Sequence, residues 1–465
     1  MKKTIKSILG CAVIALSLGA LYSCSEKIDI ETGNEVEIET TVKTCPMNFE
    51  GGVVGFDQNM TKGLTKAASS SWNDGDKVYI IFYNGTTKVP GEATYSTSGG
   101  WNVSYDGDLA TGTGLKCEVR YFINATFQSS SLVSLNSATE IYEATNGSYE
   151  YNGSTLTVQA SMTPKTGRIR FSGKSGEKIY LTGISVYTTY SPALNTFSST
   201  KSMIATTVAT SGYTPYIYGS LADSNKQLGL VGSDYAFTRT CTDAVLKVGD
   251  SGYMAIPSDK SHNNWKSGLY VTTSGVEFKM VPVAGHSSGF FMIGETEVTR
   301  ELYYKITGTS SSSNLNHPIS NVTYPNFASF ITQLNYNTNL TFSLPTKDQW
   351  LYAAKGGNLS QGYIYSGSNN PGDVAWYEGN SQGAVHPVKQ LAPNELGIYD
   401  MSGNVDEYTS TKYSTSYTYS YYRGGGNYRS AASGIKKDYM TYYSTDSSSY
   451  TADNLWGFRL ILVCQ

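Results

Sequence analysis

The sequence has few of the side chains on which most metal-dependent and nucleophilic enzymes rely. Its 465 residues include four histidines and six cysteines, and no two cysteines show the Cys-x-x-Cys spacing of a zinc or redox site. Charge is also scarce, because 34 lysines and arginines stand against 37 acidic residues and no basic run is interleaved with aromatic residues. The composition therefore gives no support to nucleic-acid binding, and we expect no nucleic acid among the partners.

Long apolar segments are absent too, apart from one near the start. Lysines within the first six residues precede an apolar stretch over residues 8–21, which is too short for a comfortable membrane span and is typical of an export signal. The stretch ends at Leu21-Tyr22-Ser23-Cys24, which resembles the lipobox of bacterial lipoproteins. That resemblance implies a signal peptide over residues 1–23, a lipid on Cys24 that attaches the chain to the membrane, and a polar tether over residues 24–35. A secretory signal with an incidental cysteine remains the alternative.

Disulfides cannot be assigned from the cysteines that remain after the signal and the lipidated position. These are Cys45, Cys117, Cys241 and Cys464. An exported protein can form disulfides, and four cysteines allow three connectivities. Free buried thiols are equally compatible with the spacing.

Tyrosine is the abundant residue, with 38 copies among many serines, threonines, glycines and asparagines. That mixture suits β-sheets joined by ordered polar loops. From about residue 36 to residue 275, short runs of β-branched and aromatic residues such as Lys77–Phe82 alternate with Gly, Asn and Ser turns. The pattern predicts β-sandwiches, which we place at residues 36–165 and 166–275.

Three short motifs in this region resemble those of fimbrillin-like proteins from Bacteroides and its relatives. They are Trp72–Val78, Thr163–Phe171 and Gly252–Pro257. The resemblance implies two tandem transthyretin-like β-sandwiches, a lipoprotein precursor, and a role as pilus subunit or surface anchor with other pilus subunits as partners. A generic β-sandwich stalk is the alternative.

Helical signals begin only after Gly275. A short helix is expected over residues 299–305, and the apolar side chains of residues 327, 330, 331 and 334 share one face of a second helix. Thr346 and Gln349 form a capping box, which predicts a third helix from this point to Ala354. The chain then ends in a strand-like run over residues 456–463.

The stretch Leu396–Tyr408 carries two carboxylates, Asp400 and Glu407, on either side of a Ser-Gly-Asn turn. We expect an oxygen-rich loop that folds back on itself, because the glycine permits a sharp bend and carbonyl oxygens can fill the gap. Such a loop could hold a hard cation such as calcium. A polar surface turn is the alternative.

The C-terminal part, residues 276–465, resembles the formylglycine-generating-enzyme (sulfatase-modifying factor) family. The motifs that carry the resemblance occur in order at 291–299, 317–319, 344–354, 392–405, 423–425 and 457–460. The implied fold is C-type-lectin-like, with a small twisted antiparallel sheet, two helices and much ordered loop. The whole chain is therefore expected to be mainly β with an α+β C-terminal domain.

The resemblance also implies which functions this copy has kept. Catalytic members oxidise a substrate cysteine with a copper ion and a pair of cysteines that follow the Arg-Gly-Gly motif. Here residues 423–433 contain no cysteine, so we expect a domain without catalytic residues. The family's structural calcium site maps onto Asp400, Gly403, Val405 and Glu407.

Two segments rich in Tyr, Ser and Thr, residues 408–422 and 439–450, flank that motif. Binding loops favour this mixture, because tyrosine gives a large contact area at a small entropy cost. The candidate ligand-binding residues are Tyr417, Tyr419, Tyr421, Tyr422, Arg423, Asn427, Tyr428, Arg429, Tyr439, Tyr442 and Tyr443. A pair of solvated β-hairpins is the alternative.

Taken together, these features predict a lipid-anchored adhesin at the cell surface or outer membrane, associated with pili and placed at their tip. Its lectin-like domain would bind a glycan or a protein. An oxidase of the formylglycine-generating type and a structural pilus subunit are the alternatives.

Overall fold

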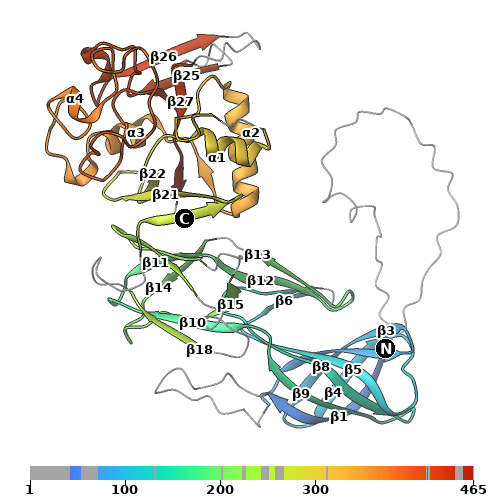
Figure 1. Ribbon diagram of the computed structural model, residues 1–465. Coiled ribbons are helices and arrows are strands. Elements are labelled where there is room, and N and C mark those ends of the chain that lie inside the picture. Colours follow the sequence, from blue (N-terminus) through green and yellow to red (C-terminus); the bar gives the residue numbers. More distant parts are fainter. Residues whose placement is uncertain are drawn as a thin grey trace, which may run out of the picture. The chain divides into compact units, whose positions relative to one another are not determined.

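The computed structural model describes residues 42–53, 72–129, 132–200, 203–221, 227–241, 251–256, 266–309, 313–414, 416, 419–445 and 454–463. The expected signal, Cys24, the whole of the expected tether and Cys464 lie outside these residues. Strands predominate, and helices are concentrated in the C-terminal part (Figure 1), so the coarse fold class is confirmed. Among the helices described, none is long and apolar enough to cross a membrane.

The first domain is a closed barrel. Its strands, in order around the barrel, are β1 (Val42–Val53), β4 (Gly100–Asp106), β3 (Thr87–Ser96), β2 (Lys77–Asn84), β5 (Gly112–Ile123), β8 (Glu140–Tyr151) and β9 (Leu156–Pro164). We expected a sandwich of two sheets. The sheet closes because β1 pairs antiparallel with β4 on one edge and parallel with β9 on the other. Closure leaves no free strand edge around the barrel.

An aromatic cluster lies against the core of this barrel and explains the first of the three motifs. The Trp72 ring packs edge-on against Phe49, Trp101 and Tyr121, with ring centroids 5.0–5.7 Å apart. Edge-to-face packing of this kind stabilises aromatic pairs beyond the area they bury. The tryptophan of the motif is therefore a packing residue.

The second domain consists of two sheets with one core between them. The first sheet has the order β18 (Ser251–Ala255), β10 (Gly167–Ser172), β15 (Ile217–Leu221), β12 (Ile184–Ser191), β7 (Leu132–Ser134) and β6 (Thr126–Ser129), and β13 (Thr196–Thr200) also pairs with β12. The second has the order β14 (Ile204–Thr207), β11 (Lys178–Thr182), β16 (Gln227–Val231), β17 (Ala236–Thr240) and β19 (Lys266–Ser267). Phe171 and Ile184 from the first sheet pack with Leu181 and Leu230 from the second.

The boundary between the first two domains is less simple than the predicted break at residue 165. The hairpin β6–β7 precedes the last two strands of the barrel, yet β7 pairs with β12 through Val133 and Ser134. The sequence in this hairpin contains nothing that distinguishes it from the barrel strands. Its membership of the second sheet is set by pairing with a strand about fifty residues further on.

The cysteines that the structure describes do not form disulfides. Cys45 and Cys117 lie in the barrel core and Cys241 in the core of the second domain, all as free buried thiols. Burial raises the pKa of Cys117 to about 12, so this thiol is not reactive at neutral pH.

The C-terminal domain contains two sheets and the helices. One sheet has the order β20 (Leu269–Thr273), β21 (Val276–Val283), β22 (Phe291–Gly294), β28 (Ile461–Val463) and β23 (Phe342–Ser343), and the other β26 (Met440–Thr445), β25 (Tyr419–Gly424), β24 (Asp406–Lys412) and β27 (Trp456–Phe458). The helices are α1 (Arg300–Thr307), α2 (Tyr324–Thr338), α3 (Lys347–Ala354) and α4 (Pro371–Val374), with 3₁₀ turns η1 (Gly357–Leu359) and η2 (Ala432–Ile435).

The predicted helix starts are confirmed in detail. The Thr346 hydroxyl accepts a bond from the amide of Gln349 at 3.2 Å, and the amide of Thr346 donates to the Gln349 side chain at 2.9 Å. In α2, Phe327, Phe330 and Leu334 are buried as the spacing indicated. The terminal run is the exception, because it divides into β27 and β28, and a fully buried arginine, Arg459, lies between them.

Candidate functional site

The stretch Leu396–Tyr408 crosses the middle of the C-terminal domain before it enters β24. Four of its residues have left-handed backbone conformations, Gly397 (φ 82°), Asp400 (φ 59°), Gly403 (φ 79°) and Asn404 (φ 58°). The amide of Gly403 donates to the carbonyl of Gly425 and the amide of Asn404 to the carbonyl of Trp376, both at 2.8 Å. The loop therefore folds back on itself, as predicted, and ties two other segments together.

Glu407 is the centre of a buried hydrogen-bond network. Arg459 donates from Nη2 to Oε1 at 2.6 Å and from Nε to Oε2 at 2.7 Å, and Trp350 Nε1 also donates to Oε2 at 2.7 Å. The guanidinium donates further to the carbonyls of Gly294 at 2.9 Å and Tyr399 at 2.8 Å. Glu407 and Arg459 are both fully buried, so this is an ion pair whose remaining polar atoms are also bonded.

Sequence reasoning missed this role of Arg459. The residue was noted only as part of a family motif. A usable signal was present, because one arginine stands inside the apolar run from Phe458 to Val463. A charge in such a run must be paired if the run is buried.

Two further buried carboxylates, those of Asp400 and Glu297, interact electrostatically with the ion pair. Asp400 is buried, and its Oδ2 accepts a bond from the amide of Lys389 at 2.7 Å. Burial raises the pKa of Asp400 to about 6. Burial, together with the charges of Asp400 and Glu407, also raises the pKa of Glu297 well above its ordinary value. Three carboxylates are therefore buried together with one guanidinium, and only Glu407 is bonded to it.

The arrangement does not fit calcium at the predicted ligands in this conformation. Both oxygens of Glu407 are engaged by Arg459 and Trp350, so none is free for a cation. In the part of the chain that the structure describes, no group of three His, Cys, Asp or Glu side chains is placed to hold a metal ion. Calcium at Asp400, Gly403, Val405 and Glu407 stays a prediction that requires Glu407 to exchange its partner.

Replacing Asp400 by asparagine tests both the buried charge and the metal. In the presence of a calcium chelator, Asp400→Asn should raise the free energy of unfolding at pH 7.5 by on the order of 3 kcal/mol, because a group with its pKa raised from 3.8 to about 6 is destabilising when ionised. In the wild type, the Asp400 carboxyl binds a proton more readily in the folded state than in the unfolded state. The stability of the wild type should therefore rise as the pH falls from 7 towards 4. The difference in stability between the wild type and Asp400→Asn should disappear by pH 4.

Urea unfolding at pH 7.5, 5.5 and 4 measures this difference. A loss of stability in Asp400→Asn at pH 7.5 in chelator would contradict the buried-charge explanation. Addition of calcium distinguishes a metal site from a plain polar turn. A calcium site should stabilise the wild type by an amount that grows with calcium concentration. No such shift in the wild type would reject the predicted site.

The structure distributes the candidate ligand-binding residues between the surface and the interior. Tyr417 lies outside the described residues, and Tyr419 and Tyr443 are described only as backbone in β25 and β26. Tyr439 and Tyr442 are exposed, as is Arg429. Tyr421 and Tyr422 are half-buried, and the Tyr421 ring stacks on Tyr324 with centroids 4.1 Å apart.

Three of the candidates are buried and hold the domain together. The Arg423 guanidinium lies 4.0 Å from the centroid of the Trp456 ring. Asn427 donates to Oδ2 of Asp406 at 2.9 Å. Tyr428 is 3% exposed, which leaves its ring no surface for a ligand. Burial is continuous from Arg423 to Tyr428, so this segment runs through the interior of the domain, whereas the prediction placed these residues on a binding surface.

Two exposed tyrosines, Tyr413 and Tyr442, lie with the half-buried Tyr422 and Lys347 in a group that we call the tyrosine surface. Tyr413 and Tyr442 stack with ring centroids 3.5 Å apart at an interplanar angle of 7°. Tyr422 packs edge-on against Tyr413 at 5.4 Å, and the Lys347 ammonium lies 4.2 Å above the Tyr422 ring. Tyr413 had been included only as part of a Tyr-rich segment.

Comparison with known proteins gives the C-terminal domain a family. Residues 266–463 match the family described as "Sulfatase-modifying factor enzyme 1-like domain". The chain is 46% identical over 84 residues to "Chaperone protein LppX" of Paenibacillus barcinonensis, covering 14% of this chain and 30% of that protein. It is 32% identical over 80 residues to "Inactive C-alpha-formylglycine-generating enzyme 2" of Bos taurus, covering 15% and 27%. The chain thus spans about a third or less of the length of these relatives.

A solved structure resembles a larger part of the chain. The fimbrial anchor protein Mfa2 from Porphyromonas gingivalis is similar at 11% identity and a TM-score of 0.26, over 50% of this chain and 99% of that one. In this chain, the residues that match the sulfatase-modifying-factor family model, 266–463, follow N-terminal domains built of β-strands.

Proposed function

We propose that this chain is a surface-exposed adhesin, anchored through its N-terminal lipid and associated with pili, whose lectin-like C-terminal domain binds a glycan or a protein. The observation that carries the proposal is the tyrosine surface. Tyr413 and Tyr442 are 44% and 49% exposed although they stack on each other. Aromatic rings held rigidly at the surface are typical of binding sites, since little entropy is lost when a ligand covers them.

The chemistry of the tyrosine surface suits a flat polar ligand with apolar faces. The tyrosine rings offer faces for the C–H groups of a sugar or for side chains of a protein, and their hydroxyls offer hydrogen bonds. Lys347 adds a cation at one end of the patch, over the ring of Tyr422. Among the described residues, no carboxylate forms an ion pair with this lysine. Its charge is therefore available to a ligand.

Binding without catalysis is supported by the segment after Arg423. Copper-dependent cysteine oxidation in the resembling family needs two cysteines in this segment, and residues 423–433 contain none. The segment is filled by close packing instead, since a Cβ on Gly424 would lie 2.6 Å from the Trp350 ring and one on Gly426 would lie 2.3 Å from the carbonyl oxygen of Gly434. A relative whose name describes an inactive enzyme is consistent with this loss.

The N-terminal half supports the location in the proposal. Its motifs resemble those of fimbrillin-like proteins, and the start of the chain resembles a lipoprotein signal. Along the chain, two β-domains separate such an anchor from the C-terminal domain. Other pilus subunits are the expected partners of these β-domains.

Removal of one ring from the stacked pair tests the proposed function. The full chain is screened against glycan and host-protein arrays, and a hit is measured by surface plasmon resonance for the wild type, Tyr442→Ala and Tyr413→Ala. We expect each substitution to weaken binding by at least about tenfold, because central tyrosines contribute more than 1 kcal/mol at interfaces.

The matched control is Tyr336→Ala, which removes a tyrosine that is 82% exposed on α2. It should leave the affinity within about twofold of the wild type. Equal losses in Tyr442→Ala and Tyr336→Ala would show that the tyrosine surface is not the site. Copper uptake with oxidation of a cysteine-containing peptide would replace the binding function by an enzymatic one.

A further inference from the structure

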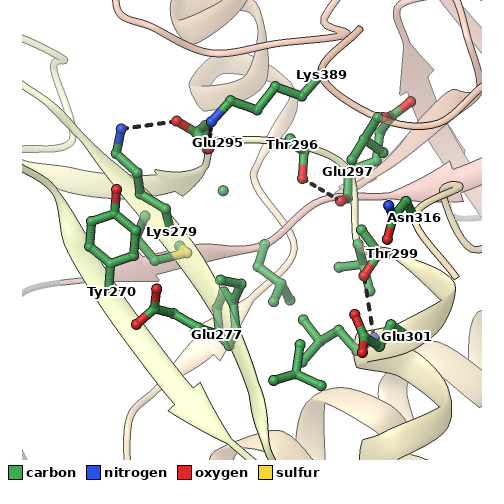
Figure 2. A pocket seen from close by; sticks show the side chains of 18 residues that line it. Tyr270, Glu277, Lys279, Glu295, Thr296, Glu297, Thr299, Glu301, Asn316 and Lys389 are labelled. Carbon is green, nitrogen blue, oxygen red and sulfur yellow. Dashed lines mark hydrogen bonds and ion pairs between the residues drawn. The ribbon is translucent and has the colours of Figure 1, made fainter.

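A cavity of about 320 Å³ lies in the C-terminal domain and shares no residue with the tyrosine surface. Its walls come from the hairpin β20–β21, the turn between β22 and α1, and residues 388–389 (Figure 2). Tyr270, Phe278 and Val388 are half-buried and contribute apolar surface to the lining, whereas more than half of the lining residues are polar or charged. The volume is at the lower end of the range for small-molecule pockets.

One side of this pocket carries a net positive charge. The Glu295 carboxylate accepts from the ammonium groups of both Lys279, at 2.9 Å, and Lys389, at 2.7 Å. Figure 2 shows Glu295 between the two lysines. Two cations share one anion, so one positive charge is left over, and each ammonium has further N–H groups to donate.

The other side carries a negative charge without a partner. Glu301 lies in the first turn of α1, and no ion pair or side-chain hydrogen bond joins its carboxylate to any residue that the structure describes. The side-chain amide of Asn316 is likewise unbonded within the described residues. Figure 2 places Thr299, Glu301 and Asn316 along the side of the pocket away from Glu295.

The two other glutamates in the lining do not alter this polarity. Glu277 is paired with Lys266 at 3.4 Å and accepts from Gln227 at 3.1 Å. Glu297 is buried, and its Oε2 lies 3.5 Å from the side-chain nitrogen of Asn404, on the side of the Arg459 network. The pocket is therefore positive at the lysines and negative at Glu301, with polar and apolar side chains between them (Figure 2).

We propose that this pocket binds a small zwitterion of amino-acid to dipeptide size, with its carboxylate at Lys279 and Lys389 and its ammonium at Glu301 and Asn316. The apolar side chain of such a ligand would lie against Tyr270, Phe278 and Val388, which are only half-buried. A ligand with a single charge would leave one end of the pocket without a counter-charge, so both charges are needed for full affinity. The proposal does not depend on a ligand at the tyrosine surface.

The test removes each charge of the ligand in turn, and separately removes the protein carboxylate that would face the ligand's ammonium. Leucine, leucyl-leucine, N-acetyl-leucyl-leucine and leucyl-leucine amide are titrated into the full chain by isothermal calorimetry. We expect leucine or leucyl-leucine to saturate the protein, and each blocked dipeptide to bind at least about tenfold more weakly than the free dipeptide, because charge-assisted hydrogen bonds are lost. Glu301→Gln should weaken the free dipeptide by a similar factor and leave the N-acetylated form unchanged.

Glu277→Gln is the matched control, because it makes the same change of charge in the lining at a carboxylate that Lys266 already neutralises. Its affinity for the free dipeptide should stay within about twofold of the wild type. Equal affinity for free and blocked dipeptides, equal losses in the two variants, or no saturable binding of any of the four probes would overturn the proposal. Thermal unfolding of both variants confirms that they are folded before titration.

Discussion

Substitution of Arg459 by methionine should destabilise the C-terminal domain by about 3–5 kcal/mol, because removal of one partner leaves the other charge buried without compensation. Here the cost falls on Glu407, whose two oxygens would keep only the indole of Trp350 as a donor. The carbonyls of Gly294 and Tyr399 would lose their donor as well. Guanidinium unfolding followed by tryptophan fluorescence measures the loss.

Two companion variants make this expectation specific to the buried pair. Lys279→Met breaks an ion pair with Glu295 that is partly exposed, and it should cost no more than about 1 kcal/mol. The double variant Arg459→Met/Glu407→Gln should recover part of the loss, since no uncompensated charge remains between these two positions. A loss in Arg459→Met as small as that in Lys279→Met would mean that the network contributes little.

Substitution of Gly403 by alanine should have the second large effect, a loss of about 3 kcal/mol or more. A Cβ at this position would lie 2.2 Å from the carbonyl oxygen of Trp376, and backbone atoms cannot move aside without breaking the bond from the Asn404 amide to that oxygen. The left-handed backbone at φ 79° adds a further cost.

Substitution of Gly397 by alanine distinguishes the cost of a steric clash from the cost of the left-handed backbone conformation. It has φ 82° in the same stretch, but a Cβ there would meet nothing within 4 Å. Gly397→Ala should therefore cost only about 1–2 kcal/mol, which is the penalty for the left-handed conformation alone. Thermal and denaturant unfolding of the two variants measures the difference. Equal losses would show that the contact with Trp376 is not rigid.

Local features of the fold were predictable because their causes lie within a few residues. The capping box of α3 needs only Thr346 and Gln349, and the buried face of α2 follows from the spacing of Phe327, Phe330 and Leu334. Closure of the first domain into a barrel was not predictable in the same way. It depends on which strands β1 finds on each edge, and both pairings join segments far apart in the chain.

The candidate site also has features that neighbouring residues predict and features that depend on residues far apart in the chain. The fold-back of Leu396–Tyr408 follows from its glycine and asparagine, whereas the partner of Glu407 lies 52 residues away. Composition alone indicated a Tyr-rich binding face, but it could not say that Arg423, Asn427 and Tyr428 turn inward while Tyr442 and the unselected Tyr413 turn outward. That division depends on the pairing of β24, β25 and β26.

The hairpin β6–β7 has a consequence for the order in which the chain acquires its structure. Synthesis and export deliver the N-terminal segments first. Residues 126–134 therefore emerge well before β12, to which β7 pairs through Thr189 and Tyr190. The barrel strands β8 and β9 arrive in that interval, so the barrel has all its strands while the hairpin still has an unpaired edge. Until β12 arrives, that edge is open to strands of other chains.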